Sequence, residues 1–152
     1  MMIHRISSTI LYHGSRKQFP DGFVLTPQND GYVSGGGDEF SAGILETERF
    51  LEGLRPADKL ARHGSVFLVD NPDDIDFAGG YTDYIYKVQP IGEVQRSDMA
   101  WYSDLDVHFH DIQSRTQCAK NYWAGVPYTN APNSLWEYRT ASARIISEVQ
   151  DV

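Results

Sequence analysis

The residues Tyr12-His13-Gly14-Ser15 place an imidazole, a glycine and a hydroxyl side by side at the end of an apolar run. A strand end is where a rigid scaffold presents polar groups to a ligand. Gly14 has no side chain, so a flat ligand can come close to its backbone N–H and C=O groups. His13 can donate or accept a hydrogen bond beside it. The tetrapeptide therefore predicts a ligand-binding site at the end of a strand.

Other residue types that do chemistry form weaker patterns. His108 and His110 resemble a pair of metal ligands, but side chains two residues apart diverge on a helix and point to opposite faces of a strand. Cys118 is the only cysteine, which excludes an intrachain disulfide and favours a buried, inert thiol. Residues 35–37 are three glycines without the lysine and hydroxyl residue of a phosphate-binding loop. We expect no metal site.

The elements that position these residues follow from the spacing of apolar and turn-forming residues. Strands are predicted over residues 6–13, 23–25, 65–70, 84–89, 136–140 and 143–149. Helical segments are predicted over residues 47–54, 57–62 and 107–123, with a further helix start at Asn71-Pro72 and a loop over residues 28–41. We expect the strand at residues 84–89 to end at Pro90-Ile91-Gly92. The pattern is that of a small α+β domain.

Composition limits the classes of protein. The 152 residues are 41% hydrophobic and 12% aromatic, which predicts one domain over residues 1–152 with a real core. The net charge of −8 argues against broad electrostatic binding to nucleic acid or to anionic membranes. Residues 1–8 lack the apolar core of a signal peptide, and no apolar run is long enough to span a bilayer. We expect a soluble cytoplasmic protein.

Four segments carry a further pattern in chain order. They are Leu11-Tyr12-His13-Gly14-Ser15, Ser65-Val66-Phe67-Leu68-Val69-Asp70, Ile85-Tyr86-Lys87-Val88-Gln89-Pro90-Ile91-Gly92, and Glu137-Tyr138-Arg139-Thr140 with the strand over residues 143–149. Together they resemble the ADP-ribosyltransferase superfamily, in its His-Tyr-Glu branch. That branch includes poly(ADP-ribose) polymerases, diphtheria-type toxins and the small rifamycin ADP-ribosyltransferases, whose layout is the most similar. The resemblance implies two short packed antiparallel or mixed sheets with peripheral helices.

The resemblance also implies a reaction, cleavage of NAD at the nicotinamide–ribose bond and transfer of ADP-ribose to an acceptor. It assigns the Gly14 backbone to the nicotinamide amide, His13 to the adenosine-side ribose, and Ser15 to a ribose hydroxyl. Phe67 stands where the family carries its motif tyrosine; a phenyl ring can still stack on the cationic nicotinamide. Tyr81 is the candidate for the family's second aromatic residue, with Tyr84 as the alternative.

The catalytic carboxylate is expected to hold the ribose 2′-hydroxyl and to oppose the positive charge that develops as nicotinamide leaves. Glu137 matches the glutamate of the polymerases and toxins, so we take His13 and Glu137 as the catalytic pair. The rifamycin enzymes use an aspartate after the stretch that matches Pro90-Ile91-Gly92, which makes Asp98 or Glu93 the competing choice.

Two other functions remain open. Phe67 at the tyrosine position is compatible with an inactive NAD-binding module, and an RNA 2′-phosphotransferase shares the implied fold. The net charge of −8 argues against the second, because that enzyme needs a basic surface for RNA. We expect the acceptor to be a protein or a small molecule rather than nucleic acid, and the residues do not identify it further.

Overall fold

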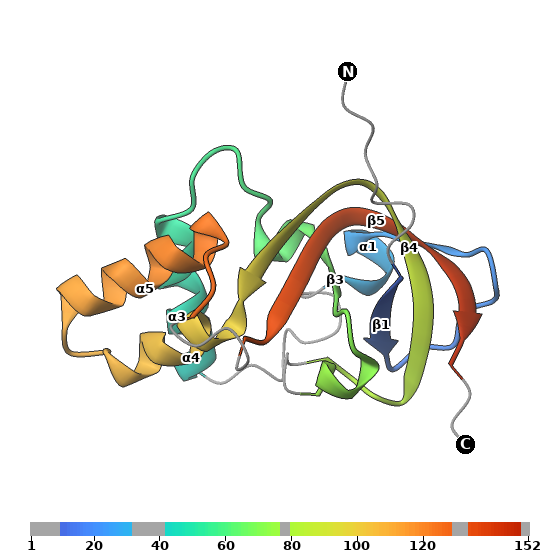
Figure 1. The fold of residues 1–152 in the computed structure, drawn as a ribbon, viewed down its shortest axis with the longest axis horizontal. Helices are drawn as coiled ribbons and strands as arrows, with labels where there is room; N and C mark the ends of the chain where they lie inside the picture. The colour runs from blue at the N-terminus through green and yellow to red at the C-terminus, as the bar shows by residue number, and fades with distance from the viewer. Residues whose placement is uncertain (1–9, 32–41, 77–79, 129–133, 150–152) are drawn as a thin grey trace.

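A computed structural model describes residues 10–31, 42–76, 80–128 and 134–149 of the chain. The element order is β1 (Leu11–Ser15), β2 (Val24–Leu25), α1 (Pro27–Asp30), α3 (Ala42–Gly53), η3 (Arg62–Gly64), β3 (Val66–Leu68), η4 (Pro72–Asp74), β4 (Tyr84–Asp98), α4 (Met99–Val107), α5 (Ile112–Ala124) and β5 (Trp136–Glu148). Helices α3, α4 and α5 gather at one end of the molecule and the sheet occupies the other (Figure 1). The mixed α+β class predicted from the sequence is confirmed.

The strands form one five-stranded sheet in which the pairs are antiparallel, in the order β1-β4-β5-β2 with β3 also on β5. The expectation of two separate packed sheets is therefore wrong. The long strands β4 and β5 arch together across the molecule (Figure 1). Each also pairs with other strands, β4 with β1 and β5 with β2 and β3. A bridge between Tyr12 and Val69, with N···O distances of 2.8 and 2.9 Å, joins β1 to the end of β3. It closes β1, β4, β5 and β3 into a ring.

Strand β4 continues past Pro90-Ile91-Gly92, where we expected it to end. The register of β4 against β5 shifts between Ile91 and Val94, and Gly92 there has a positive φ of 86°. A bulge of this kind bends a strand without ending it. The same pairing joins the two predicted final strands into the single strand β5.

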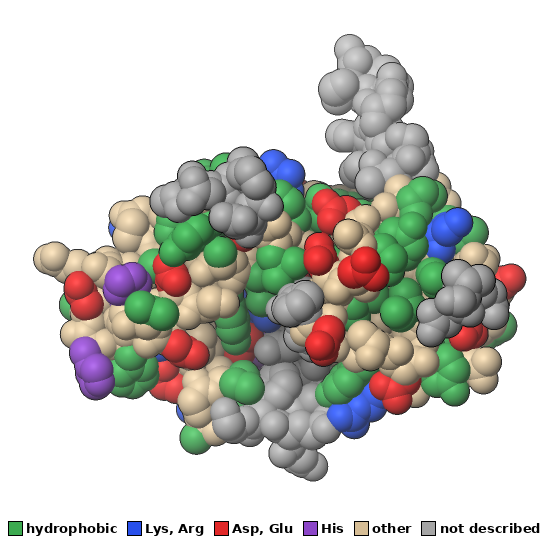
Figure 2. Space-filling model, turned by 60° about the horizontal axis from the view of Figure 1, so that its bottom comes forward, with side chains coloured by type: hydrophobic (Ala, Val, Ile, Leu, Met, Phe, Trp, Pro, Cys, Tyr) green, Lys and Arg blue, Asp and Glu red, His purple; other side chains and the backbone are tan. Residues whose placement is uncertain are grey.

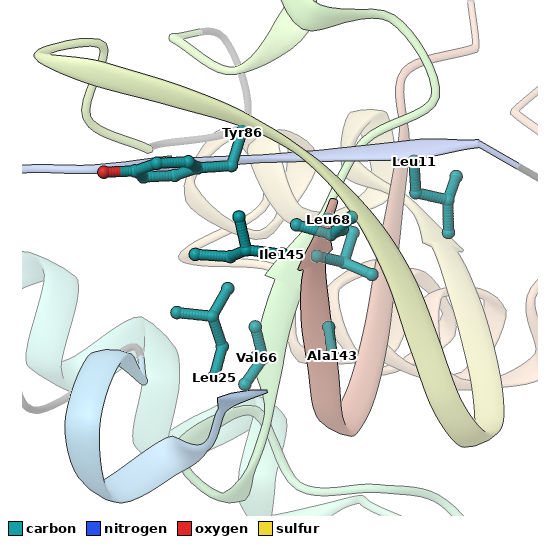
Figure 3. Packing of buried hydrophobic residues seen from close by; sticks show 8 residues of the cluster. Leu11, Leu25, Val66, Leu68, Tyr86, Ala143 and Ile145 are labelled. Carbon is teal, nitrogen blue, oxygen red and sulfur yellow. The ribbon is translucent and has the colours of Figure 1, made fainter. Parts of the chain in front are cut away.

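The sheet closes over a core to which every strand contributes. Its buried members are Leu11, Leu25, Val66, Leu68, Tyr86, Val88, Ala143 and Ile145. In Figure 3 these side chains point toward one another, with the ring of Tyr86 along one side. A second apolar cluster lies among the helices and includes Leu51, Leu105, Cys118 and Trp123. The molecule thus has two separate apolar cores, one inside the sheet and one among the helices.

Helix boundaries depend on capping residues. Asn71 accepts a hydrogen bond from the Asp73 amide and Pro72 follows it, which confirms the predicted helix start, although η4 is one short 3₁₀ turn. The helix predicted over residues 107–123 starts too early: Val107 ends α4, and α5 begins at Ile112, where Asp111 caps it by accepting from the Ser114 amide. The chain leaves α5 as expected at Gly125, whose φ is 73°.

Three other expectations need correction. Residues 57–61 do not form a helix; only η3, at residues 62–64, follows Pro56. Helix α3 begins at Ala42, before the predicted start at residue 47. Part of the predicted loop is helix α1, in which Thr26 and Asn29 form a reciprocal capping box; residues 32–41, with their glycine run, lie outside the described part of the chain.

Candidate functional site

The end of β1 brings His13 and Ser15 into buried positions. His13 is 6% exposed and Ser15 is 1% exposed. The His13 Nδ1 atom lies 2.8 Å from the Phe67 carbonyl oxygen, and its Nε2 atom lies 2.6 Å from Oδ2 of Asp30. The Ser15 hydroxyl accepts a hydrogen bond from the Lys17 amide at 2.9 Å. Both polar side chains of the motif are therefore already bonded to the protein.

The partners of His13 determine how its ring is oriented. A backbone carbonyl only accepts, so Nδ1 donates to the Phe67 carbonyl oxygen. Nε2 then faces the Asp30 carboxylate, so the ring is held between β3 and α1. A ribose hydroxyl can bond to Nε2 only by replacing Asp30.

Gly14 has a structural reason to be glycine. A Cβ atom at this position would lie 2.0 Å from the Tyr81 carbonyl oxygen and 2.6 Å from Cγ2 of Ile75. The segment that carries Tyr81 is thus packed directly on the end of β1. The Arg16 guanidinium lies 4.1 Å from the centre of the Tyr81 ring and extends this contact. The other aromatic candidate, Tyr84, packs against the sheet core.

Phe67 lies in the middle of β3 and is half-buried. Its neighbours in β3, Val66 and Leu68, point into the apolar core, so the alternation of the strand directs the Phe67 ring to the opposite face. The guanidinium of Arg62 lies 4.8 Å from the centre of that ring. Phe67 therefore contacts both His13, through its backbone, and Arg62, through its side chain.

Glu137 is fully buried near the start of β5. Its Oε1 atom lies 2.6 Å from Nη1 of Arg62 and 3.1 Å from the Tyr122 hydroxyl. Its Oε2 atom has no hydrogen-bond partner among the described residues. One carboxylate oxygen is thus fixed by the protein and the other remains available to a donor.

The Glu137 contacts belong to a larger polar network between the two apolar cores, which we call the arginine network. Arg62 also binds both carboxylate oxygens of Glu48 at 3.0 and 3.1 Å, and Tyr102 donates to Glu48 at 2.7 Å. Arg139 donates to Ser97 at 2.8 Å and to Tyr122 at 3.2 Å. The network comprises Glu48, Arg62, Ser97, Tyr102, Tyr122, Glu137 and Arg139.

Tyr122 lies at the centre of this network. Burial raises the pKa of Tyr122 to about 12, with the nearby arginines acting in the opposite direction. Its hydroxyl stays protonated at neutral pH, so it donates to Glu137 while it accepts from Arg62 and Arg139. Arg62 binds the Glu137 carboxylate directly, and Arg139 reaches it through the Tyr122 hydroxyl, so both guanidinium groups adjoin this carboxylate.

The two competing carboxylates lie elsewhere. Asp98 is fully buried at the N-terminus of α4 and accepts hydrogen bonds from the amides of Ala100, Tyr128 and Leu135. Its position explains a structural role as a cap and organiser of the segment before β5. Glu93 is exposed on β4, where its side chain accepts a hydrogen bond from Nε2 of Gln95 at 3.0 Å. Of the three candidates, Glu137 alone lies in the network that contacts Phe67.

The structure brings some of the residues that the sequence singled out into contact with one another. His13 contacts Phe67, Gly14 contacts Tyr81, and Arg62 joins Phe67 to Glu137. Sequence reasoning missed Arg62 and Asp30, which bind the two expected catalytic residues directly. Arg62 follows the segment Pro56-Ala57-Asp58-Lys59-Leu60-Ala61, and Asp30 follows Asn29. Neither local sequence distinguishes these two residues from solvated charges.

Comparison with protein-family models and a search of curated proteins both found no match to this chain. Within the described residues, no helix is both long enough and apolar enough to cross a bilayer.

Proposed function

We propose that this chain is an NAD-dependent ADP-ribosyltransferase that cleaves the nicotinamide–ribose bond and transfers ADP-ribose to a protein or small-molecule acceptor. The observation that carries the proposal is the Phe67 residue, which links His13 at the end of β1 to the arginine network around Glu137. Contacts from Phe67 to His13 and to Arg62, and from Arg62 to Glu137, support the proposal, because they connect residues from separate parts of the chain.

The proposed mechanism gives each residue one task. The nicotinamide lies against the Gly14 backbone and stacks on Phe67 with Tyr81 beside it, while His13 and Ser15 hold ribose hydroxyls. Oε2 of Glu137 accepts a hydrogen bond from the ribose 2′-hydroxyl. As nicotinamide leaves with the bonding electron pair, the negative charge of Glu137 opposes the positive charge on the ribose ring. The acceptor then bonds to the anomeric carbon and gives up its proton.

NAD binding by this route requires local rearrangement. Glu137 is fully buried and His13 already contacts Asp30, so the nucleotide must displace groups at both residues. These same observations favour a second function, an NAD-binding module without catalysis, in which Glu137 serves only to balance Arg62. Both functions require NAD binding, and only the first requires release of nicotinamide.

Two measurements on the full chain separate these functions. Calorimetry and thermal denaturation with NAD test binding, because a ligand selective for the folded state raises Tm. Chromatography of the nicotinamide released in a single turnover tests catalysis. We expect binding, a raised Tm and nicotinamide release, with binding weakened in His13→Ala and unchanged in the control His110→Ala, which alters an exposed histidine. Binding without release supports the module, and absence of binding excludes both functions.

A further inference from the structure

A second cluster of potential ligand atoms lies in the α4–α5 pair, at the opposite end of the molecule from β1 (Figure 1). The cluster consists of Asp104 in α4, His108 at the C-terminus of that helix, and Cys118 in α5. A carboxylate oxygen, an imidazole nitrogen and the thiol sulfur of these residues all lie within 4.8 Å of one another.

The fold accounts for this convergence. Asp104 and His108 are four residues apart, a spacing that places both side chains on one face of a helix. Asp111 ends the turn after α4 by capping α5, which then packs on α4 through the cluster that contains Leu105 and Cys118. The thiol therefore points toward the face of α4 that carries the other two ligands.

The donor set is characteristic of zinc. Zn²⁺ binds carboxylate oxygen, imidazole nitrogen and thiolate sulfur with bond lengths of about 2.0–2.3 Å, which puts tetrahedral ligand atoms roughly 3.3–3.8 Å apart. Separations of up to 4.8 Å thus need closure by about 1 Å, within the reach of side-chain rotation. Hard cations such as Mg²⁺ and Ca²⁺ prefer all-oxygen sites, which this cluster does not offer.

A supporting contact fixes the carboxylate. The hydroxyl of Tyr128 lies 2.5 Å from Oδ2 of Asp104 and donates to it. Outer hydrogen bonds of this kind orient the ligands of a metal site and are part of its affinity. The second oxygen of Asp104 can then face an ion that is also bound by His108 and Cys118.

We propose that Asp104, His108 and Cys118 form a Zn²⁺ site that joins α4 to α5, independent of the proposed NAD site. Binding breaks the S–H bond of Cys118, releases its proton to solvent and forms a Zn–S bond. Asp104 and His108 are half-buried, so the ion enters from their side and keeps a water molecule as its fourth ligand. The sequence-based expectation of no metal site considered His108 only as a partner of His110. The present proposal, in which His108 acts with Asp104 and Cys118, replaces that expectation.

The test uses the full chain after treatment with a chelator and its removal. Calorimetry with Zn²⁺ alone measures affinity and stoichiometry, and absorption spectroscopy with Co²⁺ detects a thiolate-to-metal charge-transfer band. We expect one ion per chain, the band, and a Tm that rises with Zn²⁺ concentration. Tyr128→Phe should weaken Zn²⁺ binding by about 10–100-fold, as loss of an outer-shell partner does, and His108→Gln should weaken it more.

Two variants decide the outcome. Cys118→Ala should lose the Co²⁺ band, whereas His110→Gln, which changes a neighbouring exposed histidine, should keep both the band and the affinity. Circular dichroism without metal shows whether each variant is folded. If Cys118→Ala does not fold, His108→Gln, which changes a half-buried side chain, still tests the site. A band that persists in Cys118→Ala, or Zn²⁺ affinity unchanged in His108→Gln, means an adventitious ion only and overturns the proposal.

Discussion

Glu137 is a completely buried acidic side chain, and the arginine network explains how the fold tolerates it. Arg62 binds both Glu48 and Glu137, and Arg139 is linked to Glu137 through Tyr122. Desolvation of charged groups is costly, and removal of one partner leaves its counterpart uncompensated. The same arrangement holds an acidic side chain in a region from which water is excluded, where electrostatic effects on a reaction are strongest.

Glu137→Gln keeps the shape of the side chain and removes its charge. We expect single-turnover nicotinamide release to fall by roughly 10²–10³, as for loss of one preorganised electrostatic group, with little change in NAD affinity. The matched control is Glu93→Gln, an exposed carboxylate on the adjoining strand, which should retain the wild-type rate. Because the substitution also weakens a buried ion pair, Tm must be measured beside the rate. A normal rate in folded Glu137→Gln would remove this residue from catalysis.

Phe67 offers a test of the aromatic position. We expect Phe67→Tyr to maintain or increase NAD turnover, because it restores the hydroxyl of the family motif while keeping the ring. Phe67→Ala should weaken NAD binding and cost about 1–3 kcal/mol of stability, less than the roughly 3–5 kcal/mol of a fully buried ring. Calorimetry with NAD and denaturant unfolding provide the two values. Unchanged NAD affinity in a folded Phe67→Ala protein would place the ring outside the site.

At the scale of elements, the end of β1 depends on its close contact with the segment at Tyr81. In Gly14→Ala the new methyl group meets backbone at 2.0 Å, which a side-chain rotation cannot relieve. We expect unfolding free energy to fall by at least about 1–3 kcal/mol and NAD binding to be lost. Gly53→Ala is the control, because a Cβ there meets open space at the end of α3. This substitution should raise the unfolding free energy by about 0.4–1 kcal/mol. Equal stability of the two variants in urea would contradict this packing.

The stability that Asp98 contributes between α4 and β5 depends on pH. Burial raises the pKa of Asp98, but the amides of Tyr128, Ala100 and Leu135 outweigh burial and hold the pKa below its usual value. A depressed pKa in the folded state contributes stability that is complete above the unfolded pKa of about 3.9 and is lost as the pH falls through the folded value.

The corresponding measurement compares wild type with Asp98→Asn by urea unfolding at several pH values. We expect wild type to be more stable at neutral pH, and the difference to shrink as the pH falls below about 3.9. A difference that stays constant down to strongly acidic pH would show that the charge of Asp98 contributes nothing to this end of α4.

Local signals in the sequence predicted some elements well and others poorly. The cap at Asn71 and the stop at Gly125 depend on residues next to one another in the chain, and these predictions are confirmed. Strand β1, which we expected to end at His13, continues to Ser15, because Gly14 and Ser15 pair with Ile85 and Tyr84 of β4. Strand β4 crosses Pro90-Ile91-Gly92 because β5 pairs with it on both sides of the bulge, a contact that no local pattern contains. Likewise, nothing near Arg62 reveals its partners, which come from α3, α5 and β5.

For the whole molecule, charge remains the simplest constraint on partners. The chain carries 21 acidic residues against 13 lysines and arginines, and acidic side chains predominate over basic ones on the face shown in Figure 2. We expect no mobility shift of a 2′-phosphorylated RNA at physiological salt, because such binding requires neutralised phosphates. A salt-sensitive shift would restore the RNA 2′-phosphotransferase as a candidate and contradict the expected preference for a protein or small-molecule acceptor.

Strand β5 has a consequence for the order in which the protein is made. It pairs with β2, β3 and β4, yet it follows all of them in the chain. Until the ribosome has released residues 136–148, β2 and β3 lack their antiparallel partner, and both Glu137 and Arg139 are missing from the buried network. The contacts that complete the sheet span long separations in sequence, which slows folding. The pairing of β1 with β4 needs no residue of β5, whereas the pairs of β2, β3 and β4 with β5 can form only once this last strand is available.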